Sequence, residues 1–142
     1  MSTIVTRGKR EREVNETDRV IVRDVPSTET SAIEVLFGLW EPDATRPAVR
    51  AQNTVPASML IARATYAPNS LSALIRHTCE EAVLGLSGQG AVIDEHGGRY
   101  PLDPGQLALI RSEAWHAMGA GPAGLTVLFW FPVGEYPPTE HG

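Results

Sequence analysis

The sequence is poor in cysteine: Cys79 is the only one among its 142 residues. No disulfide can therefore form within the chain. The sequence also lacks an apolar run of the roughly 20 residues that a membrane-spanning helix needs. Its beginning, MSTIVTRGKREREVNETDR, has none of the apolar core of a signal peptide. We therefore expect a cytoplasmic protein that does not associate with membranes.

Positive charge is scarce as well. The chain has 12 Lys and Arg against 17 Asp and Glu, which gives a net charge of -5. Binding to nucleic acid favours a basic face, and this composition supplies no such electrostatic footprint. The expected partner is a small-molecule substrate.

Turn-forming residues, in contrast, are plentiful, with 13 Gly and 11 Pro. They argue against a helical bundle and, with short β-branched segments between them, predict an all-β fold. A chain of this length fits one domain that buries roughly 68% of its unfolded surface. We expect residues 1–18 to form a flexible or loosely docked N-terminal arm, helix-like at most, and residues 19–142 to form a single domain.

Some eight or nine short strands are predicted along the domain, separated by turn signals. The stretch from Trp40 to Ser58 contains three prolines and no clear period, which indicates a long loop that could close over a site. In LSALIRH the two-residue period of a strand places Ile75 and His77 on one face. The clearest strand segments are RVIVRDV (19–25), AIEVLFGL (32–39), 58–66, 71–77, QLALIR and LTVLFWF. The stretch EAVLGLSGQGAVIDEHGGRYPLD is predicted to form a strand, a turn and a second strand, AVID, that pairs with RYPL in a hairpin.

Three side chains with metal-binding chemistry lie in the second half of the chain. His77 and Glu81 belong to RHTCEEAVLGLSGQG, and His116 closes the segment DPGQLALIRSEAWH. Imidazole nitrogen and carboxylate oxygen together suit divalent Fe, Zn, Mn or Ni, and three ligands leave positions open for substrate. Two alternatives stay open: the histidines are hydrogen-bonded core residues, or the trio works as acid and base without a metal.

Residues 58–132 resemble the small single-domain cupins. The first motif of that family runs Gly, five residues, His, one, His, three or four, Glu, six, Gly, and its positions here are Asn69, Ile75, His77, Glu81 and Gly88. The second runs Gly, five, Pro, one, Gly, two, His, three, Asn, and falls on Gly105, Arg111, Glu113, His116 and Ala120. The resemblance implies a jelly-roll barrel, the double-stranded β-helix, whose motif strands turn His77, Glu81 and His116 into a pocket around a divalent metal.

Ile75 occupies the place where the family usually has its first histidine. It is either a neutral replacement in a three-ligand site or part of a pocket remade for an apolar substrate. We expect Ile75, Trp115, Met118 and Trp130 to contact the substrate, although Trp130 also fits an ordinary core position. His96 and His141 are expected to be exposed and outside the site.

The resemblance implies an enzyme acting on a largely apolar organic molecule. It is most similar to polyketide cyclases, isomerases and dehydratases, with His77, Glu81 and His116 as catalytic residues. Two alternatives remain, an Fe(II)-dependent dioxygenase and a small-molecule-binding cupin without turnover. Related small cupins often pair through sheet edges, so we expect a homodimer to which residues 19–25 could contribute a strand.

Overall fold

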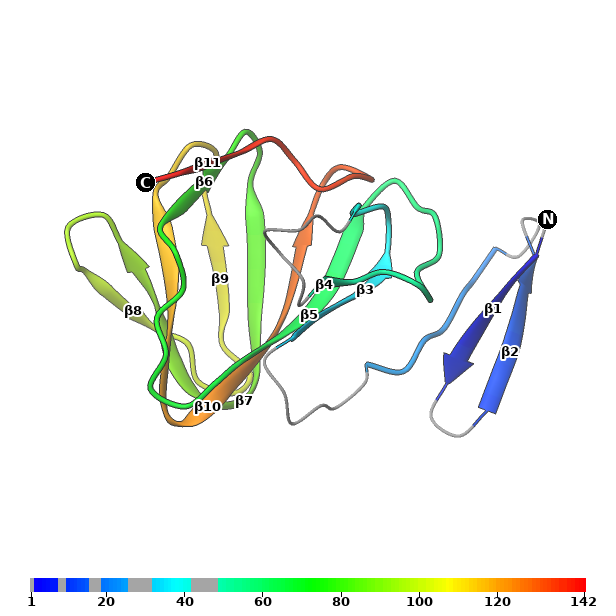
Figure 1. The fold of residues 1–142 in the computed structure, drawn as a ribbon, viewed down its shortest axis with the longest axis horizontal. Helices are drawn as coiled ribbons and strands as arrows, with labels where there is room; N and C mark the ends of the chain where they lie inside the picture. The colour runs from blue at the N-terminus through cyan, green and yellow to red at the C-terminus, as the bar shows by residue number, and fades with distance from the viewer. Residues whose placement is uncertain (1, 8–9, 16–18, 26–31, 42–48) are drawn as a thin grey trace.

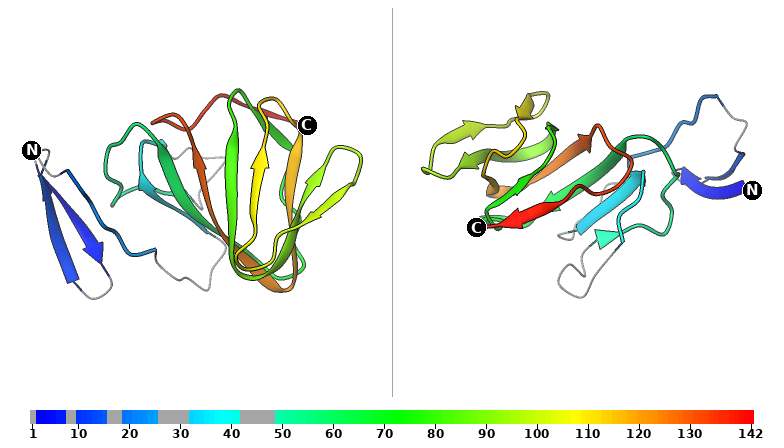
Figure 2. Two further views of the ribbon diagram at one scale, coloured as in Figure 1. Left: turned by 180° about the vertical axis from the view of Figure 1, so that it is seen from behind. Right: turned by 90° about the horizontal axis from the view of Figure 1, so that it is seen from above.

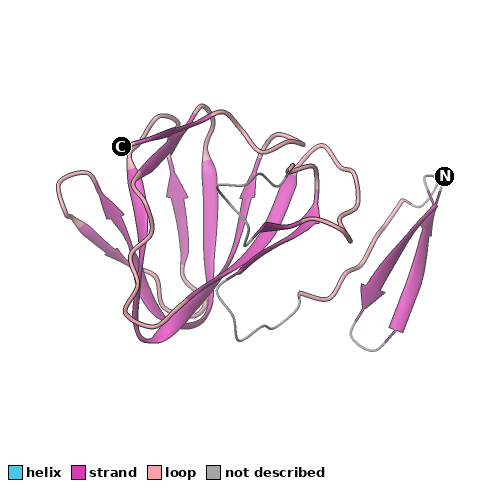
Figure 3. Ribbon diagram, in the orientation of Figure 1, coloured by secondary structure: helices cyan, strands magenta, loops and turns pink. Residues whose placement is uncertain are grey.

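The computed structural model describes residues 2–7, 10–15, 19–25, 32–41 and 49–142. These residues form strands and loops, and no helix occurs among them (Figures 1 and 3). It follows that the described residues hold no helix long and apolar enough to cross a membrane. The predicted all-β class is confirmed.

The main sheet contains nine strands and curls into a barrel-like body (Figure 2). Its strand order is β11-β6-β10-β5-β3-β4, and β7 pairs with β10, β8 and β9. The strands are β3 (Ala32–Phe37), β4 (Val49–Arg50), β5 (Leu60–Tyr66), β6 (Ile75–His77), β7 (Glu81–Asp94), β8 (Arg99–Pro101), β9 (Leu107–Ile110), β10 (His116–Phe131) and β11 (Thr139–His141).

The two longest strands, β7 and β10, run through both layers of the barrel. The first half of β7 pairs with the second half of β10, between β9 on one side and β5 and β3 on the other. The second half of β7 pairs with the first half of β10, between β8 and the short strands β6 and β11. The change of layer coincides with an irregularity between Ala120 and Leu125.

The core lies between these layers and follows the two-residue period of the strands. On β10, Val127, Phe129 and Phe131 are buried, whereas the intervening Leu128 and Trp130 are only partly covered. The inner face of β5 is filled in the same way, by Leu60, Ala62 and Ala64.

Residues 19–25 are not the strand that their composition predicts. The segment is extended but has no strand pairing among the described residues. Ile21 packs against Val55 and Phe37, and the guanidinium of Arg23 donates to the carbonyl of Leu36. Val20 is 72% exposed. β-branched residues favour strands mainly by packing beside a neighbouring strand, and here that neighbour is missing.

The N-terminal segment also differs from its prediction, since its described parts are strands and not helix-like. β1 (Ser2–Arg7) and β2 (Arg10–Asn15) pair antiparallel from Ser2↔Asn15 to Arg7↔Arg10. Residues 8–9 and 16–18 lie outside the described part. Whether this hairpin is mobile, and whether residues 19–142 are one separate domain, stay predictions.

Two other predicted segments are shorter or more ordered than expected. Of 71–77, only Ile75–His77 is strand, while Leu71 forms an isolated bridge to Gly119. The loop that begins at Trp40 contains β4, which runs parallel to β3, and Val55 bridges to Phe37. Residues 42–48 lie outside the described part, so the prediction of a closing loop stays open.

Candidate metal centre

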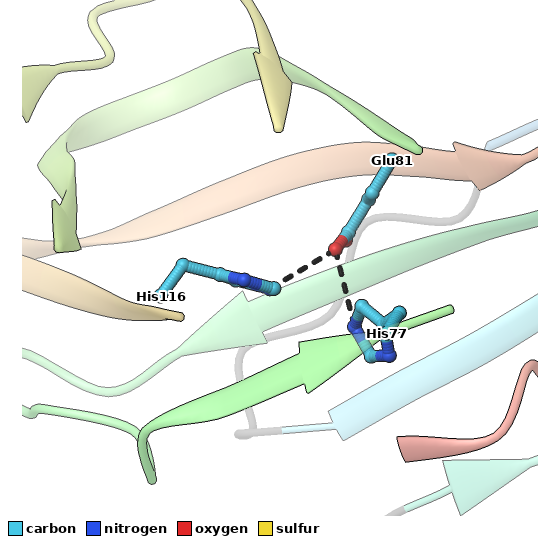
Figure 4. Close-up of side chains that lie close together, drawn as sticks. All are labelled: His77, Glu81 and His116. Atoms are coloured by element: carbon cyan, nitrogen blue, oxygen red, sulfur yellow. Dashed lines mark ion pairs between the residues drawn. The ribbon is translucent and has the colours of Figure 1, made fainter. Parts of the chain in front are cut away.

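His77, Glu81 and His116 come from three strand ends that meet inside the barrel. His77 ends β6, Glu81 begins β7 and His116 begins β10. Because β6 pairs with β10 through Ile75↔His116, the two histidines enter from neighbouring strands. A short turn after His77 brings Glu81 to face both rings (Figure 4).

The three side chains converge on one carboxylate oxygen. Oε1 of Glu81 lies 3.3 Å from Nε2 of His77 and 3.2 Å from Nε2 of His116. The possible ligand atoms of the trio all lie within 4.8 Å of one another. All three residues are buried, with at most 8% of their surface exposed. A buried carboxylate without a partner is costly, so this geometry requires a proton or a cation.

The tautomer of His77 follows from its other ring nitrogen. Nδ1 of His77 lies 2.7 Å from the hydroxyl oxygen of Thr139, and that hydroxyl donates to the carbonyl of Pro137 at 2.9 Å. Having donated its hydrogen, the hydroxyl accepts from Nδ1–H. A neutral His77 therefore directs the lone pair of Nε2 at Glu81.

The backbone fixes the tautomer of His116 in the same way. Its Nδ1 lies 2.9 Å from the carbonyl oxygen of Ala114, which can only accept a hydrogen bond. In neutral rings, both Nε2 atoms would thus point lone pairs at Glu81. Among the described residues, buried Oε1 of Glu81 then has no hydrogen-bond donor. Histidines that bind a metal typically donate a hydrogen bond from their other ring nitrogen, as His77 and His116 can do here to Thr139 and Ala114.

The electrostatics of the metal-free trio show how protons replace a cation. Burial raises the pKa of Glu81, but the hydrogen bonds and charges of His116 and His77 outweigh it and hold that pKa below its ordinary 4.5. Burial lowers the pKa of His116, but the Glu81 carboxylate outweighs it and raises that pKa above the ordinary 6.5. A positive charge at the centre of the trio is favoured.

The residues present fit a divalent metal. Two neutral imidazole nitrogens and one carboxylate oxygen, oriented by Thr139 and Ala114, form a donor set that suits Zn, Fe, Mn or Ni. The same arrangement would also allow the trio to act as general acid and base without a metal. The roles predicted for His77, Glu81 and His116 stay predictions, but the structure brings the three together.

The trio lines a cavity of about 450 Å³ whose walls are largely apolar. Trp40 and Tyr136 stack at 3.8 Å between ring centroids, and Phe131 meets both Tyr136 and His77 edge to face. No Lys or Arg lines the cavity within the part of the chain that the structure describes. The lining consists of Ile33, Trp40, Tyr66, Ser72, Ala73, Ile75, His77, Glu81, His116, Met118, Phe129, Phe131, Tyr136 and His141.

Of the four residues predicted to bind substrate, the structure places two at the cavity of the trio and two elsewhere. Ile75 and Met118 line the cavity of the trio. Trp115 lines a different cavity of about 540 Å³, and the guanidinium of Arg76 stacks over its ring at 4.8 Å. Trp130 lies between inward-facing Phe129 and Phe131 on β10, so the strand period turns it to the outer face.

Several cavity residues had no signal in the sequence. Trp40 and Tyr136 come from loops. His141, which was expected to lie outside the site, comes from β11, a strand that the sequence did not predict, and it lines the cavity. Tyr66 ends β5, and burial, with the charge of Glu81 and then Tyr136, raises the pKa of its phenol well above the ordinary value. Its hydroxyl is thus kept as a hydrogen-bond donor in the cavity wall.

Cys79 lies beside the trio but keeps its proton. Burial, and secondly the charge of Glu81, raise the pKa of the thiol. A thiol is a weak nucleophile and a poor metal ligand compared with a thiolate. The described surroundings of Cys79 therefore give it no chemical role.

Comparison with known proteins gives a family match and a shared fold. Residues 62–131 match the model of the Cupin domain family. Among solved structures, the DMSP lyase DddQ from Ruegeria pomeroyi DSS-3 is 16% identical (TM-score 0.59; 78% of this chain, 50% of that one). The polyketide cyclase RemF from Streptomyces resistomycificus is 18% identical (TM-score 0.55; 68% of each chain). A mutant of the Bacillus subtilis oxalate decarboxylase OxdC is 21% identical (TM-score 0.52; 59% and 24%).

At these identities the solved structures establish the fold alone. The alignment spans half of the DMSP lyase chain and about a quarter of the oxalate decarboxylase chain. No curated protein matches the sequence. The predicted double-stranded β-helix is confirmed by the strand pairing and by these folds. Strands β6 to β10 and most of β5 lie inside the matched region, so residues 62–131 form a cupin domain.

Proposed function

We propose that this chain is a metal-assisted cupin enzyme of the cyclase, isomerase or dehydratase type. One observation carries the proposal: two imidazole nitrogens and a carboxylate oxygen converge at the wall of a largely apolar cavity of about 450 Å³. A concave apolar site with a few convergent polar groups is the usual form of a small-molecule site. The fold is shared with a polyketide cyclase, as it is with a DMSP lyase and an oxalate decarboxylase.

The cavity favours an uncharged, largely apolar organic substrate. Aromatic walls at Trp40, Tyr136 and Phe129 offer flat contact surfaces, and the described lining residues include no Lys or Arg to pair with a substrate carboxylate. A divalent metal held by His77, Glu81 and His116 would act as a Lewis acid toward a carbonyl oxygen of the substrate.

The protein's own groups would supply orientation and proton control. The phenol of Tyr66 stays protonated and can donate a hydrogen bond to a substrate oxygen. Thr139 and Ala114 hold the imidazoles of His77 and His116 in one orientation, which limits their reorganisation during reaction. The apolar wall excludes water, which strengthens electrostatic interactions within the site.

Metal content tests the proposal. We expect the wild-type protein, purified without chelator, to contain about one divalent ion per chain and His77→Ala and His116→Ala each to lose it. His96→Ala is the matched control, since its side chain is 86% exposed and outside the trio. Equal metal content in wild type and both trio variants, or no metal in any of them, would refute a metal centre at these residues.

A second candidate is an Fe(II)-dependent dioxygenase. It is favoured by the donor set itself, because two histidines and one carboxylate with open positions are the usual ligands of non-haem Fe(II) oxygenases. Anaerobic purification separates the candidates: bound iron with substrate-dependent oxygen uptake supports the dioxygenase, and zinc without oxygen uptake supports cyclisation or isomerisation.

A third candidate is a small-molecule-binding cupin without turnover. It is favoured by the departures from the family motifs at Ile75, Arg111, Glu113 and Ala120. Such a protein would still be stabilised by its ligand, by an amount that grows with the logarithm of ligand concentration. A compound that raises the melting temperature of the metal-loaded protein yet is recovered unchanged after incubation would support this candidate.

A further inference from the structure

The C-terminal strand β11 forms part of the wall beside the trio. It pairs antiparallel with β6 in the register Thr139↔His77, Glu140↔Arg76 and His141↔Ile75. The Thr139 hydroxyl meets Nδ1 of His77 at 2.7 Å, and the Glu140 carboxylate meets the guanidinium of Arg76 at 2.7 Å. Both faces of β11 are therefore fixed to β6, and its position relative to the trio is set.

Ile75 lies between two histidines in this register. On one side β10 places His116 opposite Ile75, and on the other β11 places His141 opposite it. Directly opposed residues of an antiparallel pair share a face of the sheet, with Cβ atoms about 4.5–5.5 Å apart. His141 thus shares the sheet face of Ile75, and it lines the same cavity as Ile75 and the trio.

We propose that His141 supplies a fourth ligand to the metal centre, replacing the imidazole that Ile75 cannot provide. The inference rests on the proposed metal site of His77, Glu81 and His116. Nδ1 or Nε2 of His141 would bind as a neutral imidazole, so that three histidines and one carboxylate hold the ion. The His141 side chain is exposed at the cavity mouth, and binding requires it to turn inward about its own side-chain torsions.

This arrangement gives a physical account of the departure at Ile75. The lost imidazole is replaced from the neighbouring strand, one step across the sheet and at the far end of the chain. Because the side chain of His141 is exposed, the fourth ligand would enter from the cavity mouth and cover the bound ion. Ile75 itself then supplies an apolar wall below that ligand.

Metal affinity and ligand number test the inference. We would measure Zn²⁺ affinity by competition with a chromogenic chelator, and the visible absorption of the Co²⁺-loaded protein, for wild type and His141→Ala. We expect at least about tenfold weaker Zn²⁺ binding and an altered Co²⁺ spectrum in His141→Ala, because even partners of metal ligands contribute 10–100-fold. His96→Ala, with its side chain 86% exposed on the β7–β8 turn, should match wild type in both measurements.

A rescue variant distinguishes the loss of a metal ligand from damage to the fold. In the double variant Ile75→His/His141→Ala the imidazole returns to β6, and we expect the Zn²⁺ affinity to recover at least partly. If His141→Ala keeps the wild-type affinity and spectrum, the inference is overturned and the three-ligand centre stands. If wild type binds neither ion, the proposed metal function fails and the inference fails with it.

Discussion

At the scale of single residues, Glu81 and His116 carry opposite pKa shifts in the metal-free protein. The pKa of Glu81 lies below 4.5 and that of His116 above 6.5. A carboxyl group whose pKa is lowered by folding stabilises the fold at a pH above its pKa in the unfolded chain, and this stabilisation is lost as the pH falls through its pKa in the folded protein. A histidine whose pKa is raised by folding stabilises the fold at a pH below its pKa in the unfolded chain, and this stabilisation is lost as the pH rises through its pKa in the folded protein.

Glu81 and His116 therefore both contribute their full stabilisation of the fold between pH 4.5 and 6.5. We predict that the pair stabilises the metal-free protein most within this window. The measurement is the melting temperature of wild type and His116→Gln in chelator, across the window and on both sides. The difference between them should be largest inside the window and shrink as the pH rises beyond it. A difference that stays constant with pH would contradict the prediction.

The same residues show what sequence spacing can and cannot predict. The convergence of His77, Glu81 and His116 was implied by the resemblance to the cupin motifs, whereas the two-residue strand period by itself places only Ile75 and His77 on one face. Thr139 lies 62 positions from the ring that it orients, and Tyr66 reaches the cavity from the end of β5. No local pattern links such pairs, since only the strand order of the barrel brings them together. Trp115 and Trp130 show the converse, because aromatic character does not reveal which face a residue takes.

At the scale of elements, the place where β7 and β10 pass from one layer to the other depends on glycine. Gly88 has φ +75°, and a Cβ there would overlap the carbonyl oxygen of Gly124, which itself has φ +78°. Two chain segments approach too closely at this point for a side chain. The glycine of the first family motif thus has a backbone explanation in this structure.

Gly88→Ala should therefore destabilise the barrel more than an ordinary turn substitution does. Gly97→Ala is the matched control, because Gly97 has φ +80° but a Cβ there meets nothing within 4 Å. We expect a loss of about 1–2 kcal/mol for Gly97→Ala from the left-handed backbone. Gly88→Ala should lose a further ~1–3 kcal/mol from overlap. Urea unfolding measures both, and equal losses would show that the backbone at Gly88 moves freely.

Strand prediction succeeded where a segment has a neighbouring strand to pair with and failed where the described residues offer none. AIEVLF became β3, between β5 and β4, whereas RVIVRDV, with a similar composition, has no strand pairing among the described residues. Composition records the tendency to extend, and the partner strand decides whether a ladder forms. β11 was missed because TEH is too short and polar to show any period.

At the scale of the whole molecule, the outer face of the β9–β7–β10 layer is unusually apolar. Leu107 and Leu109 are 63% and 59% exposed, and they pair with Leu84 and Ala82 of β7. An antiparallel sheet with one solvated face normally alternates apolar and polar residues. Together with the exposed valines of residues 19–25, this leaves two apolar surfaces on the chain, and such surfaces often mark contacts with another protein.

We predict that the chain forms a homodimer to which residues 19–25 contribute. Val20 and Val22 are 72% and 45% exposed on an extended segment, and an unpaired β-prone segment is suited to pairing with a strand edge of another copy. The double variant Val20→Asp/Val22→Asp should be a monomer by size exclusion with light scattering, because it places charge in the contact. Leu71→Asp, at an equally exposed site (67%), should remain a dimer. A monomeric wild type would contradict the prediction. If the double valine variant remains a dimer, the contact lies on another surface, and the exposed face of β9 is the next surface to mutate.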